Sequence, residues 1–83
     1  MGDDNYLSKI ERNTYALDHA PEEVREECRQ NILWSREMTR RLPQLDYAVR
    51  EATIAKIHAV LDADYTKMGF QLEEQQSNSM SHR

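Results

Sequence analysis

The sequence predicts an all-α protein, with a short N-terminal helix followed by an antiparallel helical hairpin and a disordered C-terminal tail. Three observations predict this three-helix arrangement. Apolar residues recur at three- and four-residue steps in three successive segments. The chain has only two glycines and two prolines, and the Asn-Gly turn dipeptide is missing. Charged residues make up 31% and hydrophobic residues 39%, a balance typical of soluble helical domains.

The first helix is expected over residues 5–17, where Asp3 and Asp4 are both suitable N-cap residues. One narrow apolar stripe runs along it at helical spacing and consists of Leu7, Ile10, Thr14 and Leu17. Because the residue before a proline is disfavoured in helical backbone, Ala20 is expected to mark a boundary before Pro21. The first helix is then free to pack across the two that follow.

The second helix is expected over residues 21–42, beginning at Pro21, a favoured first helical position. Acidic residues follow at its start and arginines gather at its end, as the helix dipole favours. Its broad apolar side consists of Val24, Cys28, Ile32, Trp34, Met38 and Leu42. Asn31 and Ser35 also lie on that side, so the apolar stripe has a polar middle.

The third helix is expected over residues 46–68, with Asp46 as its cap and Gly69 as its stop. A seam spaced by seven, with Ile57 between, consists of Tyr47, Ile54, Leu61 and Met68, and it is expected to pack against Val24, Ile32, Trp34 and Met38. Arg50 and Asp64 share seam positions, and their heads either reach solvent or specify register. The short connection makes the two helices antiparallel. Residues 1–70 form one domain, and residues 71–83 form the tail.

A second row of small residues lies nearly opposite the seam of the third helix. It consists of Ala48, Ala52, Ala55, Ala59 and Ala63, with Val49, Thr53 and Val60 beside it. Small residues at helical spacing allow another helix to approach closely, so the first helix or a second copy of the chain is expected there. The alternative is an exposed surface, because alanine is the best helix former.

The second helix also presents one apolar residue on its charged side. Leu33 lies among four arginines at helical spacing, Arg25, Arg29, Arg36 and Arg40. An apolar anchor ringed by arginines resembles a recognition surface for a protein, and the same arginines could bind an anionic ligand. The alternative is a solvated face in which Glu22, Glu26 and Glu37 pair locally with the arginines.

Catalytic and metal-binding patterns are poorly represented, so we expect neither an enzyme nor a cofactor. Cys28 lies on the apolar stripe, which favours a buried structural thiol. His58 and Asp62 are four residues apart, but nothing supplies a third metal ligand at matching spacing. The sequence contains no glycine-rich phosphate loop and no CxxC or HExxH motif.

Charge and cysteine content restrict the partners and the compartment. The formal net charge is -4, which disfavours nonspecific binding to nucleic acid. The longest fully apolar aliphatic-aromatic run, residues 32–34, is far too short to span a membrane. A single cysteine rules out an internal disulfide and favours the cytoplasm.

The sequence thus predicts a small protein-interaction module that acts by docking, as a regulator, adaptor or inhibitor. Self-association into a homodimer or a higher closed oligomer is expected, because a core of this size is only marginally stable alone. The alternative is an oligomer that binds an anionic nucleotide or phosphate through the arginines. The layout of a short helix and a proline-punctuated hairpin resembles that of phage-encoded cyclic-nucleotide sponges, and the small size fits a phage-encoded inhibitor. That resemblance is one of layout and assigns no binding residue.

Overall fold

The computed structural model describes residues 5–72, which form three α-helices and one short 3-10 helix and contain no strand. In order, these are α1 (Asn5–Leu17), α2 (Glu22–Arg41), η2 (Leu42–Gln44) and α3 (Tyr47–Lys67). The predicted all-α, three-helix class is confirmed. The expected caps Asp3 and Asp4 lie outside the described residues. Residues 73–83 of the predicted tail also lie outside them.

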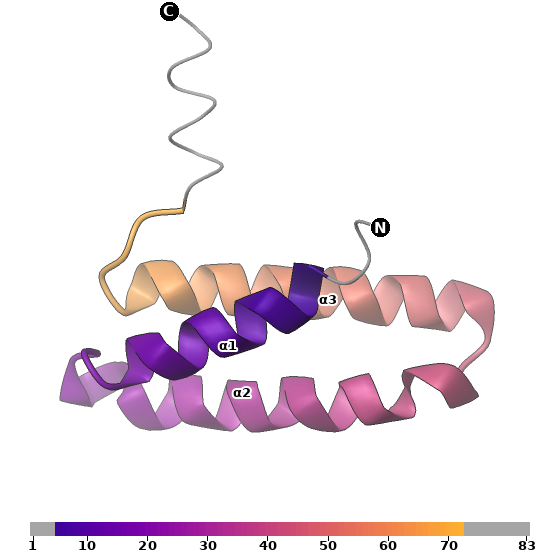
Figure 1. Cartoon of the computed structure of the whole chain (residues 1–83), viewed down its shortest axis with the longest axis horizontal. Coiled ribbons are helices and arrows are strands. Elements are labelled where there is room, and N and C mark those ends of the chain that lie inside the picture. Colours follow the sequence, from indigo (N-terminus) through magenta and orange to yellow (C-terminus); the bar gives the residue numbers. More distant parts are fainter. Residues whose placement is uncertain (1–4, 73–83) are drawn as a thin grey trace, which may run out of the picture.

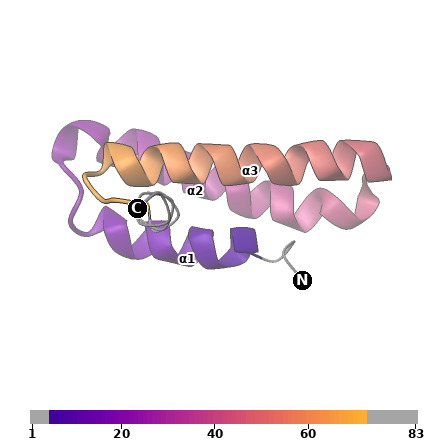
Figure 2. The same cartoon turned by 90° about the horizontal axis from the view of Figure 1, so that it is seen from above.

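Helices α2 and α3 lie side by side and run in opposite directions, as the short connection predicted (Figure 1). Helix α1 crosses one face of this hairpin and contacts both of its helices (Figure 2). Tyr6 and Ile10 of α1 join Ile32 of α2 and Ile57 of α3 in one core cluster. The three helices therefore share a single main core, and α1 is part of it.

The ends of α2 follow from its sequence. Pro21 was predicted to be the first helical residue, but it occupies the position before it, with an extended ψ of 144°. Glu22 and Glu23 occupy the first turn. Arg40 and Arg41 occupy the last turn. Both sets of charges are favourable at their ends of the helix dipole. Pro43 then lies within η2, which closes the helix and turns the chain toward α3.

Gly69 ends α3 with a left-handed backbone, at φ 103°. The Gly69 N–H donates to the Thr66 carbonyl at 2.9 Å, and the Phe70 N–H donates to the Tyr65 carbonyl at 3.2 Å. The Phe70 ring stacks on the Tyr65 ring with 5.0 Å between centroids. This pair of hydrogen bonds and its apolar contact form a Schellman motif, which satisfies carbonyls that the helix end would leave open. The predicted stop at Gly69 has this physical basis.

Most of the predicted seam of α3 is buried as expected. Ile54, Ile57 and Leu61 lie in the main core, where Trp34 and Met38 of α2 pack beside them. Met68 lies in a second cluster. That cluster contains Ala16, Ala20 and Cys28, with Val24 packed against it.

Tyr47 was wrongly predicted to belong to the seam, because its side chain is 71% exposed. It is the first residue of α3, at the end of the hairpin where the chain turns. Leu42 is buried in the core at that end, and Leu45 packs against the same cluster. The connection therefore fills the space that the heptad pattern assigned to Tyr47.

Two polar contacts cross the hairpin between α2 and α3. Asp64 is 2% exposed and accepts a hydrogen bond from the Asn31 amide at 2.8 Å. Lys67 forms an ion pair with Glu27 at 2.9 Å. Asp64 therefore does not reach solvent, and its bond to Asn31 favours one register of the helices. Arg50 is half-buried and donates to the Leu45 carbonyl at 3.4 Å.

The buried side of α1 differs from the predicted stripe. Tyr6, Ile10, Asn13 and Ala16 are buried, while Leu7 is 45% exposed and Thr14 is exposed. The buried set includes an asparagine, which an apolar pattern excludes. Its inclusion rotates the contact side of α1 away from Leu7, which is left at the surface.

Candidate functional site

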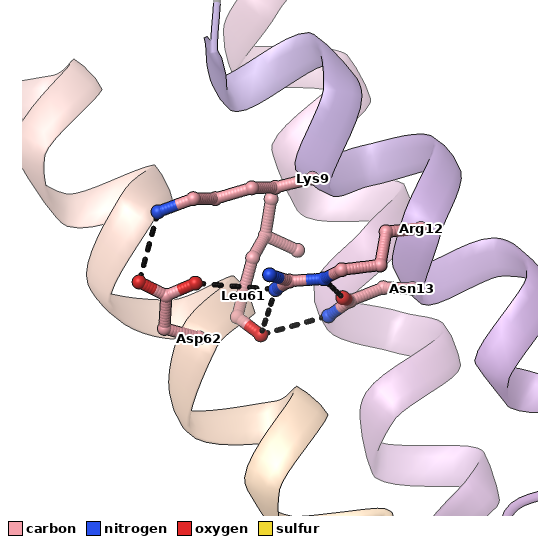
Figure 3. Close-up of polar contacts among 5 residues, drawn as sticks. All are labelled: Lys9, Arg12, Asn13, Leu61 and Asp62. Carbon is pink, nitrogen blue, oxygen red and sulfur yellow. Dashed lines mark hydrogen bonds and ion pairs between the residues drawn. The ribbon is translucent and has the colours of Figure 1, made fainter. Parts of the chain in front are cut away.

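Helix α1 is held on α3 by ion pairs that converge on Asp62 (Figure 3). The Lys9 Nζ lies 2.9 Å from one carboxylate oxygen, and an Arg12 Nη lies 3.1 Å from the other. All three side chains are largely buried at the helix interface. These ion pairs hold one side of α1 against α3. The opposite side of α1 forms one wall of a groove, and α2 forms the other wall.

The groove between α1 and α2 has a volume of about 720 Å³. Its residues come from both helices and are Leu7, Ser8, Ile10, Glu11, Leu33, Arg36, Glu37, Thr39 and Arg40. The sequence of α2 alone indicated Leu33, Arg36 and Arg40 but not that they lie beside α1. The groove arises only when α1 is placed on the hairpin.

The apolar part of this groove consists of Leu7, Ile10 and Leu33. Ile10 is buried in the core, while Leu7 is 45% and Leu33 is 47% exposed. The two leucines come from different helices, so the exposed apolar surface is shared between the two walls. Together they form a larger apolar surface than the isolated Leu33 that the sequence indicated.

The charged part of the groove contains two carboxylates and two guanidinium groups. Glu37 forms ion pairs with Arg40 and with Arg41 of its own helix. Hydrogen bonds from Arg40 and Arg41 hold the pKa of the Glu37 carboxyl below its usual value. Arg36 donates to the Thr14 hydroxyl at 3.2 Å, so its partner is a neutral group. Within residues 5–72, Glu11 has neither a hydrogen bond nor an ion pair.

The four arginines of the predicted anion site have separate surroundings. Arg25 donates to the Ala20 carbonyl at 2.9 Å. Arg29 forms an ion pair with Glu26 at 2.9 Å, and hydrogen bonds from Gln30 and Arg29 lower the pKa of that carboxyl. Only Arg36 and Arg40 line the groove. The four arginines therefore have different partners, and two of them lie outside the groove.

The alanine row of α3 is exposed along its whole length, at Ala48, Ala52, Ala55, Ala59 and Ala63. Beside it, Val49 is 49% exposed and Val60 is half-buried. The expectation that the first helix packs on this row is wrong, because α1 contacts the side of α3 that carries Leu61 and Asp62. The polar anchors of α1 match that side and have no counterpart among the alanines. The two other interpretations, an exposed surface and a contact with a second copy, stay predictions.

A smaller hollow of about 230 Å³ lies where α1 meets the end of α3. The Arg12 guanidinium lies over the Tyr65 ring, 3.9 Å from its centroid, and Phe70 stacks on that ring. Tyr15, Ala16 and His19 complete the lining. This cluster was not predicted from the sequence, although Gly69 followed by an aromatic residue is a signal for the contact between Tyr65 and Phe70.

The residues considered for catalysis or metal binding have structural contacts. The Cys28 thiol is fully buried, and its burial raises its pKa. Asp62 binds Lys9 and Arg12, and the His58 ring lies edge-on to Tyr6 with 6.2 Å between centroids. Within residues 5–72, no three His, Cys, Asp or Glu residues are grouped as metal ligands. No helix in the described range has the length and apolar character needed to cross a bilayer.

Neither a protein-family model, nor a curated protein, nor a solved structure matches this chain.

Proposed function

We propose that the chain is a small non-enzymatic protein-interaction module that docks a protein in the groove between α1 and α2. In this role it acts as a regulator, adaptor or inhibitor. The observation that carries the proposal is the pair of leucines on facing walls, Leu7 and Leu33, each nearly half exposed. Charged residues surround them. An apolar centre with a polar rim is the usual composition of a protein interface, and arginine is favoured there.

Binding of an anionic nucleotide or phosphate has less support. Arg29 and Arg40 already pair with Glu26 and Glu37, and an anion would have to displace those carboxylates. Arg25 is bonded to a backbone carbonyl outside the groove. Arg36 donates to the neutral Thr14 hydroxyl and has no carboxylate to displace within residues 5–72, but a single guanidinium is a weak basis for phosphate recognition.

The cytoplasm is the proposed compartment. The single cysteine is a free, fully buried thiol, which suits a reducing environment. The negative net charge of -4 favours a protein partner over nucleic acid.

Affinity capture from the native host, followed by mass spectrometry, tests the proposed docking surface. The wild-type chain is compared with Leu33→Glu and with Val49→Glu, since Val49 has a similar exposed fraction on a different helix. We expect a near-stoichiometric protein with the wild type and with Val49→Glu, and its loss with Leu33→Glu. Equal retention by Leu33→Glu would contradict the proposal, and so would a wild-type chain that retains neither another protein nor an untagged copy of itself.

A further inference from the structure

The groove between α1 and α2 has a charge pattern that is complementary to itself. It contains two carboxylates, Glu11 and Glu37, and two guanidinium groups, Arg36 and Arg40. Glu37 and Arg40 neutralise each other within α2. Glu11 and Arg36 lie on opposite walls, and within residues 5–72 neither forms an ion pair. One carboxylate and one guanidinium thus face the groove without a countercharge.

We infer that the occupant of this groove is a second copy of the chain, docked about a two-fold axis. This inference rests on the proposed function and names its partner. In a two-fold contact, when one residue meets another, the reverse contact forms as well. Glu11 of each copy then pairs with Arg36 of the other, and the two Leu33 side chains meet near the axis with Leu7 beside them. A single docking geometry supplies both missing countercharges and covers the exposed leucines.

A helix from an unrelated protein fits this pattern less well. A basic helix would satisfy Glu11 but would meet Arg36 with like charge, and an acidic helix would do the reverse. Its charges would have to match the two walls in the right order. The chain itself carries that order by construction, since each copy presents the same two walls. Covering Leu7 and Leu33 also adds to the small core that one chain can bury.

Charge reversal on purified full-length protein tests the inference, with sedimentation velocity as the readout. Glu11→Arg places like charges at both symmetry-related contacts, and Arg36→Glu does the same with the opposite sign. We expect each single variant to dimerise at least about tenfold more weakly than the wild type. The double variant restores opposite charges and should dimerise again. An equimolar mixture of the two single variants should form a heterodimer, because each contact then joins Arg to Glu.

Two controls separate the groove from general effects of charge. Arg29→Glu makes the same charge change on α2 outside the groove and should leave the dimer intact. Leu33→Glu should give a monomer, whereas Val49→Glu beside the alanine row should not. Circular dichroism checks that every variant keeps its helix content, since all these side chains are exposed.

Three results would overturn the inference. One is a wild-type chain that stays monomeric at roughly 100 µM, well above the range of a specific homodimer. Another is a dimer that the Leu33 and charge variants leave unchanged, which would place the contact on another face. The third is weakening by both single variants without recovery in the mixture. If the wild type is monomeric but Leu33→Glu abolishes capture of another protein, the homodimer fails and the proposed docking function stands.

Discussion

Asn13 of α1 donates a hydrogen bond from its side-chain amide to the main-chain carbonyl of Leu61 in α3, at 2.9 Å, and both residues are fully buried (Figure 3). The same carbonyl also accepts a hydrogen bond from an Arg12 Nη at 3.3 Å, so two neighbouring side chains of α1 converge on it. Losing such a partner in a buried place is costly. The contact therefore fixes the position of α1 along α3, and with it the α1 wall of the groove.

Asn13→Ala should lower the free energy of unfolding by about 1–3 kcal/mol, because the variant loses a buried hydrogen bond and leaves a small cavity. Chemical denaturation followed by circular dichroism measures this difference. Ser8→Ala, an exposed position on the same helix, is the control and should stay within about 0.5 kcal/mol of the wild type. Equal effects of the two substitutions would show that the Asn13 contact does not hold α1 in place.

Gly69→Ala should destabilise the chain by about 1–2 kcal/mol, since φ at this position is 103° and an L residue with a Cβ atom is strained there. No heavy atom lies within 4 Å of the added Cβ, so the cost comes from the backbone alone. Asn tolerates left-handed backbone better, and Gly69→Asn should recover part of the loss. Thermal denaturation gives the order wild type, Asn, Ala; an Ala variant as stable as the wild type would refute the Schellman assignment.

Cys28 should make the folded state less stable as pH rises through the alkaline range. Burial raises the pKa of the folded thiol above its ordinary value of 9.0, so the unfolded chain loses this proton first. The buried neutral thiol contributes to the free energy of unfolding. This contribution is fully present below pH 9.0 and is lost as pH rises beyond it. Urea denaturation from pH 7 to pH 10 should therefore show a decline for the wild type that is shallower for Cys28→Ala. Identical pH profiles for the two chains would contradict the buried thiol.

Phosphate and nucleotides should not raise the melting temperature of the wild-type chain. Ligands that bind only the folded state stabilise it by mass action. Arg29 and Arg40 already pair with carboxylates, so we expect no phosphate site there. Thermal shift measurements at increasing inorganic phosphate and nucleoside phosphate test this. A saturable rise with one ligand that Arg36→Glu abolishes would favour the anion-binding function over protein docking.

The sequence predicted the helices and most of the hairpin seam because these depend on local patterns. Prolines, glycine and charge placement fixed the helix ends, and the spacing of Ile54, Ile57 and Leu61 fixed the buried side of α3. Tyr47 was misplaced because the heptad pattern does not show how the connection fills the end of the hairpin. Local periodicity thus predicts which side of a helix is buried, but it does not predict which positions a neighbouring segment covers.

The candidate site was predictable only in part, because it depends on how α1 sits on the hairpin. Leu33 and its arginines could be selected from α2 alone, but the groove needs Leu7 and Glu11 from α1. The apolar stripe predicted for α1 assigned Leu7 to the core. The buried Asn13 changes that orientation. Its partner is the main-chain carbonyl of Leu61, 48 positions later, and a pattern of side chains cannot predict a bond to a main-chain atom.

Photo-cross-linking from position 33 tests the proposed docking groove most directly. A photoreactive phenylalanine analogue replaces Leu33 in one variant and Val49 in a matched variant of similar exposure on α3. On irradiation in the native host, position 33 should give a covalent protein adduct of defined mass, which a second chain or another protein can supply. Position 49 should not give that adduct, and Leu7→Glu should remove it from position 33. The absence of an adduct from position 33, or an identical adduct from both positions, would contradict docking in the groove between α1 and α2.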